Sequence, residues 1–336
     1  MDDEFLEYEE PAANQDKRAE LGLGALVCLV VFVLLAMLAF VLKEAWPAFA
    51  HNGLSMFFGS GGNADQQLQT IFTAGSENHA SNLFLRAWPI VWSTMLTTGG
   101  SVVFSFVCSL FVAVFMVEFA PGWLQRVLEP VIRLLASVPS VIYGLVGVLV
   151  VVPFIGNHLI TQSEKASVTP VISLSGYSLL AGVVILTVMI SPIMIAIFAE
   201  GLRSVPRGWL EGSLALGVNR WRTFWKIAVM SARPALVAGT VLATARALGE
   251  AVMLSMVAGT TAYAPNPFDG LIFFFEPSRG IAATILQYRD DITSPPFERT
   301  LFAFAAVLLI SAVSLSLLGW AAKQPQKRHF NVGGIV

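Results

Sequence analysis

Arg246 and Glu250 lie near the middle of an apolar segment, 234–260, that is long enough to cross a membrane. A charged side chain at the centre of a membrane helix costs about 2.5–3.5 kcal/mol on insertion scales, so it persists where it faces a partner or a polar path. On a helix, a spacing of four places both side chains on one face, where they can pair. A guanidinium is a planar fork of donors that suits phosphate oxygens. These residues therefore indicate an anion path; alternatively, they only neutralise each other or brace a neighbouring helix.

Glu250 has two roles in this hypothesis. A transport site must bind its cargo well enough to admit it and weakly enough to release it, and a carboxylate beside the arginine prevents too tight a hold on the anion. If the anion is phosphate, an ionised Glu250 also accepts a hydrogen bond from its P–OH group, which sulfate lacks at neutral pH. We therefore expect Glu250 to contribute to selectivity.

A second stretch, SVPSVIYGLVG (137–147), combines hydroxyl side chains with one proline and two glycines. The proline removes a backbone hydrogen bond and the glycines loosen the helix, so freed carbonyls and nearby hydroxyls can face a polar path. The candidate residues are Ser137, Ser140 and Tyr143. Proline and glycine are also frequent in membrane helices for packing reasons alone, and that alternative stays open.

These residues belong to a chain whose composition is that of a membrane protein. Of its 336 residues 56% are hydrophobic and only 12% are charged, and its mean hydropathy is +0.72. A helix needs about 20 apolar residues to cross the hydrocarbon. Together with 234–260, the uncharged runs 21–42, 87–117, 134–163, 166–199 and 300–322 predict an all-α membrane protein with six transmembrane helices.

The distribution of Lys and Arg predicts the orientation. If the N-terminus is cytoplasmic, 13 of the 20 Lys and Arg residues fall inside and six outside, which satisfies the positive-inside rule and places both termini in the cytoplasm. The predicted order is a cytoplasmic acidic tail (1–20), a first transmembrane helix (21–42), an extracytoplasmic loop (43–87), a core (88–320) with a cytoplasmic loop at 200–234, and a cytoplasmic tail (321–336).

The cytoplasmic loop reads as two short amphipathic helices joined at Gly217. Its arginine- and tryptophan-rich second half either docks on a protein or lies in the lipid interface. The stretch EGSLALG, with Ile227 ten residues past Gly217, resembles the EAA loop of ABC importer permeases. Glu211, Gly217 and Ile227 match that pattern in register, while Gly212 and Ser213 replace its two alanines.

The departure from the pattern comes at its end, where Val229-Met230 replaces a Leu-Pro pair and the proline is delayed to Pro234. The resemblance implies that the loop inserts into a cleft on a cytoplasmic ATPase. None of the six lysines follows a glycine, so the chain has no Gly-Lys-Ser/Thr phosphate cradle. We therefore expect no cofactor in this chain, with ATP and magnesium bound by the partner ATPase, and no catalytic or metal site.

Three further stretches, PSVIYG, MISPIMIAIFAEGLRSVPRGWLEG and RALGE, resemble the permeases of phosphate (Pst-type) ABC importers. The extra N-terminal span favours the C-type permease of that system. The resemblance implies the type I ABC importer permease fold in a bacterial plasma membrane. It also implies four partners: a homologous permease, an ATPase dimer, an extracytoplasmic phosphate-binding protein, and phosphate itself.

Alternatives to phosphate import stay open at this point. The EAA loop does not name the cargo, so another oxyanion such as sulfate, molybdate or phosphonate is the nearest alternative. A membrane sensor or an ion-driven secondary carrier is a different class, and a carrier would transport without an ATPase. An enzyme is disfavoured because no nucleophile–base or metal cluster accompanies the polar residues. Membrane lipid is an expected neighbour, and nucleic acid is not.

Overall fold

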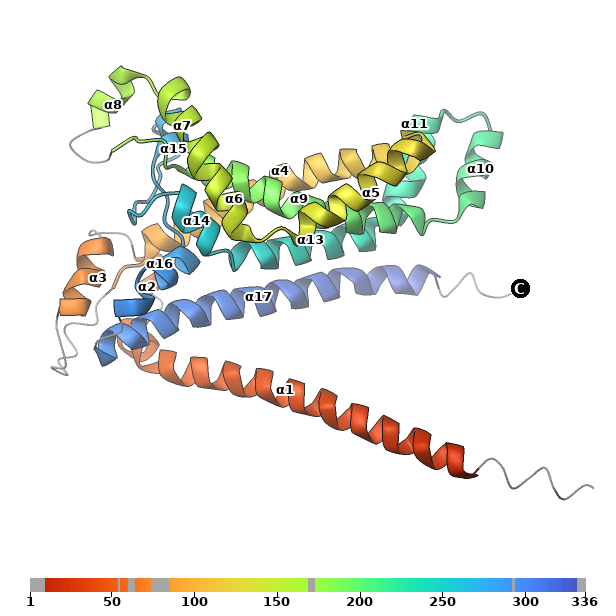
Figure 1. The fold of residues 1–336 in the computed structure, drawn as a ribbon, viewed down its shortest axis with the longest axis horizontal. Coiled ribbons are helices and arrows are strands. Elements are labelled where there is room, and N and C mark those ends of the chain that lie inside the picture. The colour runs from red at the N-terminus through yellow and green to blue at the C-terminus, as the bar shows by residue number, and fades with distance from the viewer. Residues whose placement is uncertain are drawn as a thin grey trace, which may run out of the picture.

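The computed structural model describes residues 10–53, 55–59, 64–73, 85–168, 173–291 and 294–330. Within these ranges the regular structure is helical (Figure 1). Five helical stretches are long and apolar enough to cross a membrane: Ala19–Asn52, Trp88–Phe119, Ser140–Leu159, Leu179–Arg203 and Pro295–Ala321. Arg220–Ser231 and Arg233–Leu248 pass as a sixth span when taken together, with a bend of 65° between them.

The centre of the bundle is the contact between α4 (Trp88–Val114) and α9 (Leu179–Arg203). The buried face of α4 is a row of small hydroxyl residues, which lets two membrane helices approach closely and bond across the contact. The row consists of Ser93, Thr94, Thr97, Thr98, Ser101, Ser105 and Ser109. The Ser101 hydroxyl donates to the carbonyl of Val183 at 3.2 Å, and the hydroxyls of Ser105 and Ser191 lie 3.0 Å apart.

Helix α13 (Arg233–Leu248) packs against α9, α4 and α17 (Pro295–Phe330). The approach of α13 to α9 is so close that a side chain on Gly201 would collide with Ala235. Small residues on both helices therefore fix how they pack, as is common where the surroundings are apolar.

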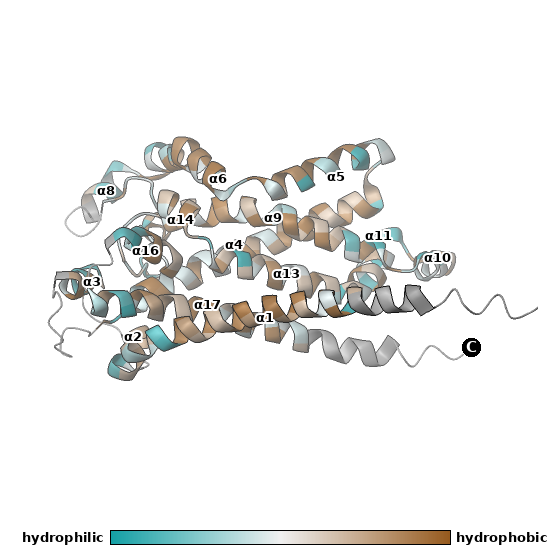
Figure 2. Cartoon of the chain, turned by 60° about the horizontal axis from the view of Figure 1, so that its bottom comes forward, coloured by the Kyte–Doolittle hydropathy of each residue, from teal (hydrophilic) through white to brown (hydrophobic). Residues whose placement is uncertain are grey.

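Helix α1 (Glu10–Asn52) touches α17 and then diverges from the bundle (Figure 1). No residue in its most apolar 18-residue window is buried, and Figure 2 shows apolar colour along it. An apolar helix that its own chain leaves uncovered must face lipid or another subunit. The helix also extends beyond the predicted 21–42, because Ala45 and Ala48 pack into the core and continue it into the segment predicted as a loop.

The predicted span 134–163 is instead two helices separated by a break. Helix α5 (Gly122–Ser137) ends before Val138 and Pro139, and α6 (Ser140–Val146) starts a run that continues through the π-turn η3 (Gly147–Val151), α7 (Val152–Phe154) and η4 (Ile155–Leu159). The backbone of Val138 is extended, with ψ 129°, as the residue before a proline tends to be.

The predicted span 166–199 begins later than expected. Helix α8 (Gln162–Val168) is separate, and α9 begins at Leu179, where the Ser178 side chain accepts a hydrogen bond from the Ala181 N–H. Gly176, with φ 96°, keeps the preceding segment out of the helix, since only glycine adopts this conformation readily.

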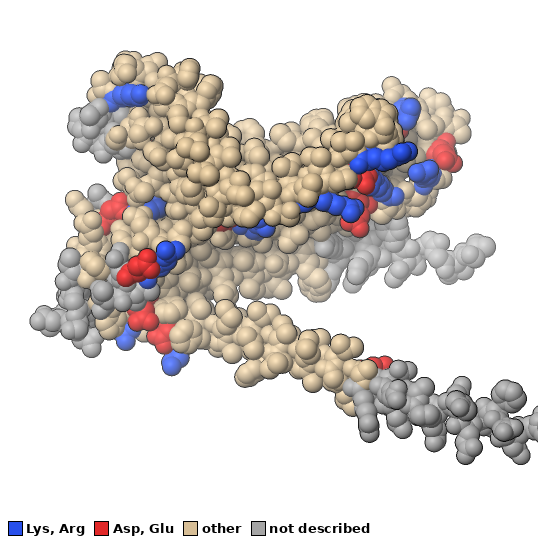
Figure 3. Space-filling model, viewed as in Figure 1, with Lys and Arg blue, Asp and Glu red and all other residues tan. Residues whose placement is uncertain are grey.

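The two ends of the bundle carry short helices. One end has α10 (Arg207–Ala215) and α11 (Arg220–Thr223), which leads into η5 (Phe224–Ala228) and α12 (Val229–Ser231); we call this the α10 end. The opposite end, the α3 end, has α2 (Ser55–Phe58), α3 (Ala64–Thr73), α15 (Ile272–Phe275), α16 (Ile281–Gln287) and η6 (Arg289–Asp291). The start of α1 and the end of α17 both lie at the α10 end, where Figure 3 shows Lys and Arg gathered.

Candidate functional site

The segment that holds Arg246 and Glu250 is not one continuous helix, so the prediction of a single span over 234–260 was wrong. Helix α13 ends at Leu248, and α14 (Val252–Val257) begins only after Gly249, Glu250 and Ala251. Glycine is the poorest helix former after proline, which weakens the helix at this point. The Glu250 carboxylate accepts a hydrogen bond from the Met253 N–H at 3.1 Å and thereby satisfies a free donor at the start of α14.

Because the helix ends between them, Arg246 and Glu250 do not share a face. Among the described residues no ion pair joins the two side chains. Arg246 is exposed on the surface of the subunit. Glu250 is half-buried and lines a cavity of about 10 Å³ together with Thr97 and Thr98 of α4. The expected pairing is therefore corrected to two different positions on either side of the break.

The second broken helix lies against the first. A side chain added to Gly144 of α6 would come within 2.7 Å of Met256 Sδ, and one added to Gly147 within 2.5 Å of Val257 Cγ1. The two glycines thus allow the α6 run to lie directly on α14 (Figure 1). The phenol of Tyr143 is in electrostatic range of Arg246. The helix that follows the break at Pro139 thus lies against the helix that follows the break at Gly249.

The three hydroxyl residues of the second stretch have different positions. Tyr143 donates its hydroxyl to the carbonyl of Leu135 at 2.8 Å, which ties α6 back to the end of α5. Ser137 is exposed and donates to the carbonyl of Leu134, also at 2.8 Å. Ser140 begins α6, is half-buried, and has no hydrogen bond from its hydroxyl among the described residues. Each hydroxyl oxygen keeps lone pairs, and that of Ser140 keeps its donor as well.

Arg246 therefore lies far from the ends of the helix bundle, on the surface of the subunit, and makes no ion pair among the described residues. It is about 20 Å along α13 from Arg233 at 1.5 Å per residue, well within the roughly 30 Å of hydrocarbon. A charge in this position persists when it faces a bundle interior or a water-filled cavity. Two broken helices beside it expose backbone groups that are tolerated at this depth only where they line such a cavity. The arrangement can hold an anion.

The second candidate region is the α10 end. No residue of α10 is buried, Leu216 is 86% exposed, and α10 projects from the bundle (Figure 1). Gly217 turns the chain with φ 78°, and this confirms the predicted break between two short helices at Gly217. The Ser213 and Thr223 hydroxyls lie 2.9 Å apart and tie α10 to α11.

The other residues of that pattern are placed where a partner can reach them. Glu211 is exposed and has no ion pair among the described residues. Gly212 has open space where a side chain would be. Ile227 is half-buried in η5. Arg220 of α11 is ion-paired to Glu118 of η2 (Phe115–Phe119), which continues α4, with Nη2 2.9 Å from Oε1, so the loop is connected to a membrane helix.

At the α3 end, Arg279 is buried and holds three segments together. Its Nη2 pairs with Asp65 of α3, its Nη1 donates to the Thr260 carbonyl at 2.6 Å, and its Nε donates to the Thr284 hydroxyl at 3.2 Å. The second carboxylate oxygen of Asp65 accepts from the Ala262 N–H at 2.8 Å. Arg279, counted in the sequence only as an outside arginine, is thus a structural centre of this end.

Glu276, three residues before Arg279, is a buried carboxyl group that accepts a hydrogen bond from the Asn266 N–H at 3.3 Å. Burial raises the pKa of Glu276 to about 7, opposed by that hydrogen bond and assisted by the nearby charge of Asp269. When a carboxyl group has a higher pKa in the folded state than in the unfolded state, the folded state loses stability as the pH rises between the two values. The reason is that only the unfolded state releases the proton in that range.

We therefore expect the segment 261–280 to become less stable between about pH 4.5 and pH 7 and to change little above that. Hydrogen–deuterium exchange of this segment at pH 5 and pH 8, corrected for intrinsic exchange rates, measures the change. Glu276→Gln should remove the difference. Equal protection of the parent at both pH values would contradict the expectation.

Over residues 105–327 the sequence matches the family described as "Binding-protein-dependent transport system inner membrane component". This match covers more than half of the chain. The chain belongs to this family of ABC importer permeases. The family is that of permease subunits without a catalytic site of their own, so a multi-pass membrane subunit with an ATPase and a substrate-binding protein as partners is implied.

Three proteins that are similar in sequence to this permease are named as transport permeases. The probable ABC transporter permease protein YqgH of Bacillus subtilis is 40% identical over 209 residues, 61% of this chain and 61% of YqgH. The probable phosphate transport system permease protein PstC of Methanocaldococcus jannaschii is 29% identical over 296 residues, 86% of this chain and 88% of that protein. PstC of Pasteurella multocida is 27% identical over 295 residues, 85% of each. The permease thus spans less than two thirds of YqgH but most of both PstC proteins.

Solved structures show the type I importer permease fold. A chain of the MetNI methionine ABC transporter in an inward-facing conformation has a TM-score of 0.51 at 20% identity, covering 70% of this chain and 94% of that chain. A chain of a bacterial alginate ABC transporter, in complex with its alginate-pentasaccharide-bound periplasmic protein, has a TM-score of 0.52 at 14% identity, covering 93% and 96%. At these identities the likeness concerns the fold alone.

Proposed function

We propose that this permease is the C-type subunit of an ATP-driven phosphate importer. The observation that carries the proposal is Arg246, a charge far from the ends of the helix bundle, exposed on the subunit and without an ion pair among the described residues. Similarity to two PstC proteins over most of the chain supports phosphate as the cargo. In this proposal Tyr143, whose phenol is in electrostatic range of Arg246, offers a hydroxyl to the anion, and Ser140 and Ser137 on either side of the Pro139 break offer two more.

The exposed face of Arg246 requires a second subunit. Lipid contact would leave the guanidinium without hydrogen-bond partners, at the cost already given for a charge at this depth. A homologous permease that covers this face encloses the anion path between the two subunits. Glu250 then acts mainly on the protein side, because it holds the break between α13 and α14 and so determines where the end of α13 presents Arg246.

The α10 end docks on the cytoplasmic ATPase dimer, which binds ATP and magnesium. An exposed carboxylate at Glu211 and the open positions at Gly212 and Leu216 fit a helix that inserts into a cleft. This orientation places both termini in the cytoplasm of a bacterial plasma membrane and the α3 end outside, where an extracytoplasmic phosphate-binding protein delivers its cargo. Alternating access follows if each ATPase state favours one state of the membrane subunits.

Uptake in proteoliposomes tests the proposal. The complete complex with its binding protein should accumulate labelled phosphate only when ATP is present on the side of the membrane where the ATPase lies. Unlabelled sulfate, molybdate or phosphonate should not compete with the labelled phosphate. Competition by one of these anions at equal concentration would identify another oxyanion importer. Uptake by this permease alone, without the ATPase, would identify a secondary carrier.

The ion pair between Arg220 and Glu118 gives a prediction about coupling. The Arg220 side chain is exposed and that of Glu118 half-buried, and an ion pair that water reaches contributes about 0–1 kcal/mol to stability, so Glu118→Gln should leave assembly intact. It should lower uptake per ATP hydrolysed several-fold, because α11 then loses its connection to the end of α4. The measurement is the ratio of phosphate uptake to ATP hydrolysis in the same vesicles.

Two controls separate coupling from a general loss of charge. Exchanging the two charges in Glu118→Arg/Arg220→Glu should restore the ratio in part. Asp290→Asn removes a more exposed pair, with Arg289 at the α3 end, and should leave the ratio unchanged. A parental ratio in Glu118→Gln would show that the loop transmits motion through other contacts.

A further inference from the structure

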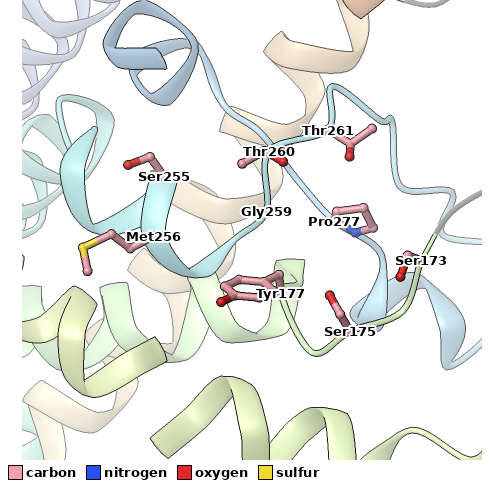
Figure 4. A pocket seen from close by; sticks show the side chains of 9 residues that line it. All are labelled: Ser173, Ser175, Tyr177, Ser255, Met256, Gly259, Thr260, Thr261 and Pro277. Carbon is pink, nitrogen blue, oxygen red and sulfur yellow. The ribbon is translucent and has the colours of Figure 1, made fainter. Parts of the chain in front are cut away.

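A pocket at the α3 end has a volume of about 510 Å³ and combines several hydroxyl side chains with the apolar side chains of Met256 and Pro277. Six of its nine lining residues carry a hydroxyl, and none carries a charge: Ser173, Ser175, Tyr177, Ser255, Thr260 and Thr261. Figure 4 shows Ser173, Ser175 and Tyr177 on one segment and Thr260, Thr261 and Pro277 across from them. An uncharged lining of this kind recognises a ligand through hydrogen bonds.

The segment before α9 is built to present these groups. Ser173, Ser175 and Tyr177 are exposed while Leu174, Gly176 and Ser178 between them are buried. The segment thus turns alternate side chains outward, with a bend at Gly176, whose φ is 96°. The buried positions anchor the segment, since the Ser178 N–H donates to the Val257 carbonyl at 3.3 Å and the Leu179 N–H to the Glu276 carbonyl at 2.8 Å.

Most of these hydroxyls are free to bind a ligand. Among the described residues no hydrogen bond uses the side-chain hydroxyls of Ser173, Ser175, Tyr177, Thr260 or Thr261, whereas Ser255 donates to the Val252 carbonyl at 2.8 Å. A hydroxyl group donates one hydrogen bond and accepts two. Five free hydroxyls around one space thus offer both donors and acceptors.

One short helix, α14, connects the pocket to the break that follows Arg246. Ser255 and Met256 are on α14, and Glu250 lies two residues before its start. The six residues of α14 rise by about 9 Å. Met256 also lies against Gly144 of α6, which is next to Tyr143 in the sequence. A ligand in the pocket is therefore one short helix away from the proposed anion path, on the outer side.

We propose that this pocket is an outer waiting site that holds a partly protonated tetrahedral oxyanion before it reaches Arg246. The inference rests on the proposed function. Protonated phosphate both accepts hydrogen bonds and donates them from P–OH, so it uses both capacities of a hydroxyl lining, whereas sulfate only accepts. Neutral groups bind an anion more weakly than a guanidinium does, so the ligand moves inward down a gradient of affinity.

The test compares two double variants of the complete complex. Ser175→Ala/Thr261→Val removes two free hydroxyls from the pocket and breaks no hydrogen bond within the described chain. Ser311→Ala/Thr240→Val is the matched control, because its hydroxyls donate to carbonyls of their own helices at 2.7 and 2.8 Å. Binding is read from the line width of the phosphorus-31 NMR signal of inorganic phosphate with the complex, without binding protein, and transport from uptake by proteoliposomes.

Added to Arg246→Ala, the pocket substitutions should remove most of the line broadening that this variant retains. Made in the parent, they should slow phosphate uptake several-fold, while the control variant should equal the parent in both measurements. Excess sulfate should not reverse the broadening in the parent. Parental broadening in the pocket variant would overturn the waiting site, whatever its uptake, and reduced uptake alone would assign the pocket to docking of the binding protein. If the parent complex itself failed to take up phosphate, that result would contradict the proposed function rather than the waiting site alone.

Discussion

Replacing Arg246 with alanine is expected to abolish ATP-driven phosphate uptake while the complex still assembles. In the proposed path the guanidinium is the anion's main charged partner, and truncating one member of a desolvated charged contact costs about 2–5 kcal/mol. That range corresponds to a loss of about 30-fold or more in uptake at limiting substrate. Arg246 makes no ion pair within the described part of the subunit, so its removal should not unfold the helix.

Three measurements on the same preparation decide this prediction. The initial rate of phosphate uptake reports on the anion path. Size-exclusion chromatography reports on assembly of the complex, and the rate of ATP hydrolysis reports on the ATPase subunits. Arg246→Lys keeps the charge but not the planar fork, and it should fall between the parent and the alanine variant. Arg299→Ala, at the start of α17, is the control for loss of an arginine from the same chain. Normal uptake by Arg246→Ala would place the substrate site elsewhere and leave Arg246 with a structural role.

The spans were predicted well where composition alone determines them and poorly where the backbone breaks. The runs 87–117 and 300–322 correspond to Trp88–Phe119 and Pro295–Ala321. In contrast, hydropathy counts apolar side chains and does not detect a local change of backbone direction. Pro139 and Gly249 were visible in the sequence, but their effect depends on whether another helix supplies the contacts that a broken helix needs.

The coupling loop was predictable because its signals are local. A glycine between two amphipathic stretches requires a turn whatever surrounds it, and Gly217 has the positive φ that such a turn needs. The relation between Arg246 and Glu250 was not predictable, since the four-residue rule assumes an unbroken helix. The contacts of Arg279 were equally hidden, because Asp65 is 214 residues away in the sequence and nothing local marks the pair.

The second large effect is expected at that pair. The Arg279 side chain is 2% exposed and that of Asp65 21% exposed, so the two single substitutions should differ in severity. Asp65→Ala leaves a buried guanidinium without its counter-charge, and breaking a buried pair in this way costs about 3–5 kcal/mol. Arg279→Met leaves a carboxylate that water reaches in part, and the methionine fills some of the vacated space, so its cost should be smaller.

A double-mutant cycle separates the charge effect from lost packing. Asp65→Ala/Arg279→Met should be more stable than Asp65→Ala alone, because no unpaired buried charge remains. Stability is measured as the thermal midpoint of the assembled complex and as deuterium protection of 64–73 and 260–288, which the pair joins. Additive losses in the double variant would mean that Thr260, Thr284 and Gln287, the other acceptors of Arg279, hold it without help from Asp65. A non-additive result would instead make the ion pair the contact that holds α3 to the outer end of the permease, next to the hydroxyl-lined pocket that Thr260 shares.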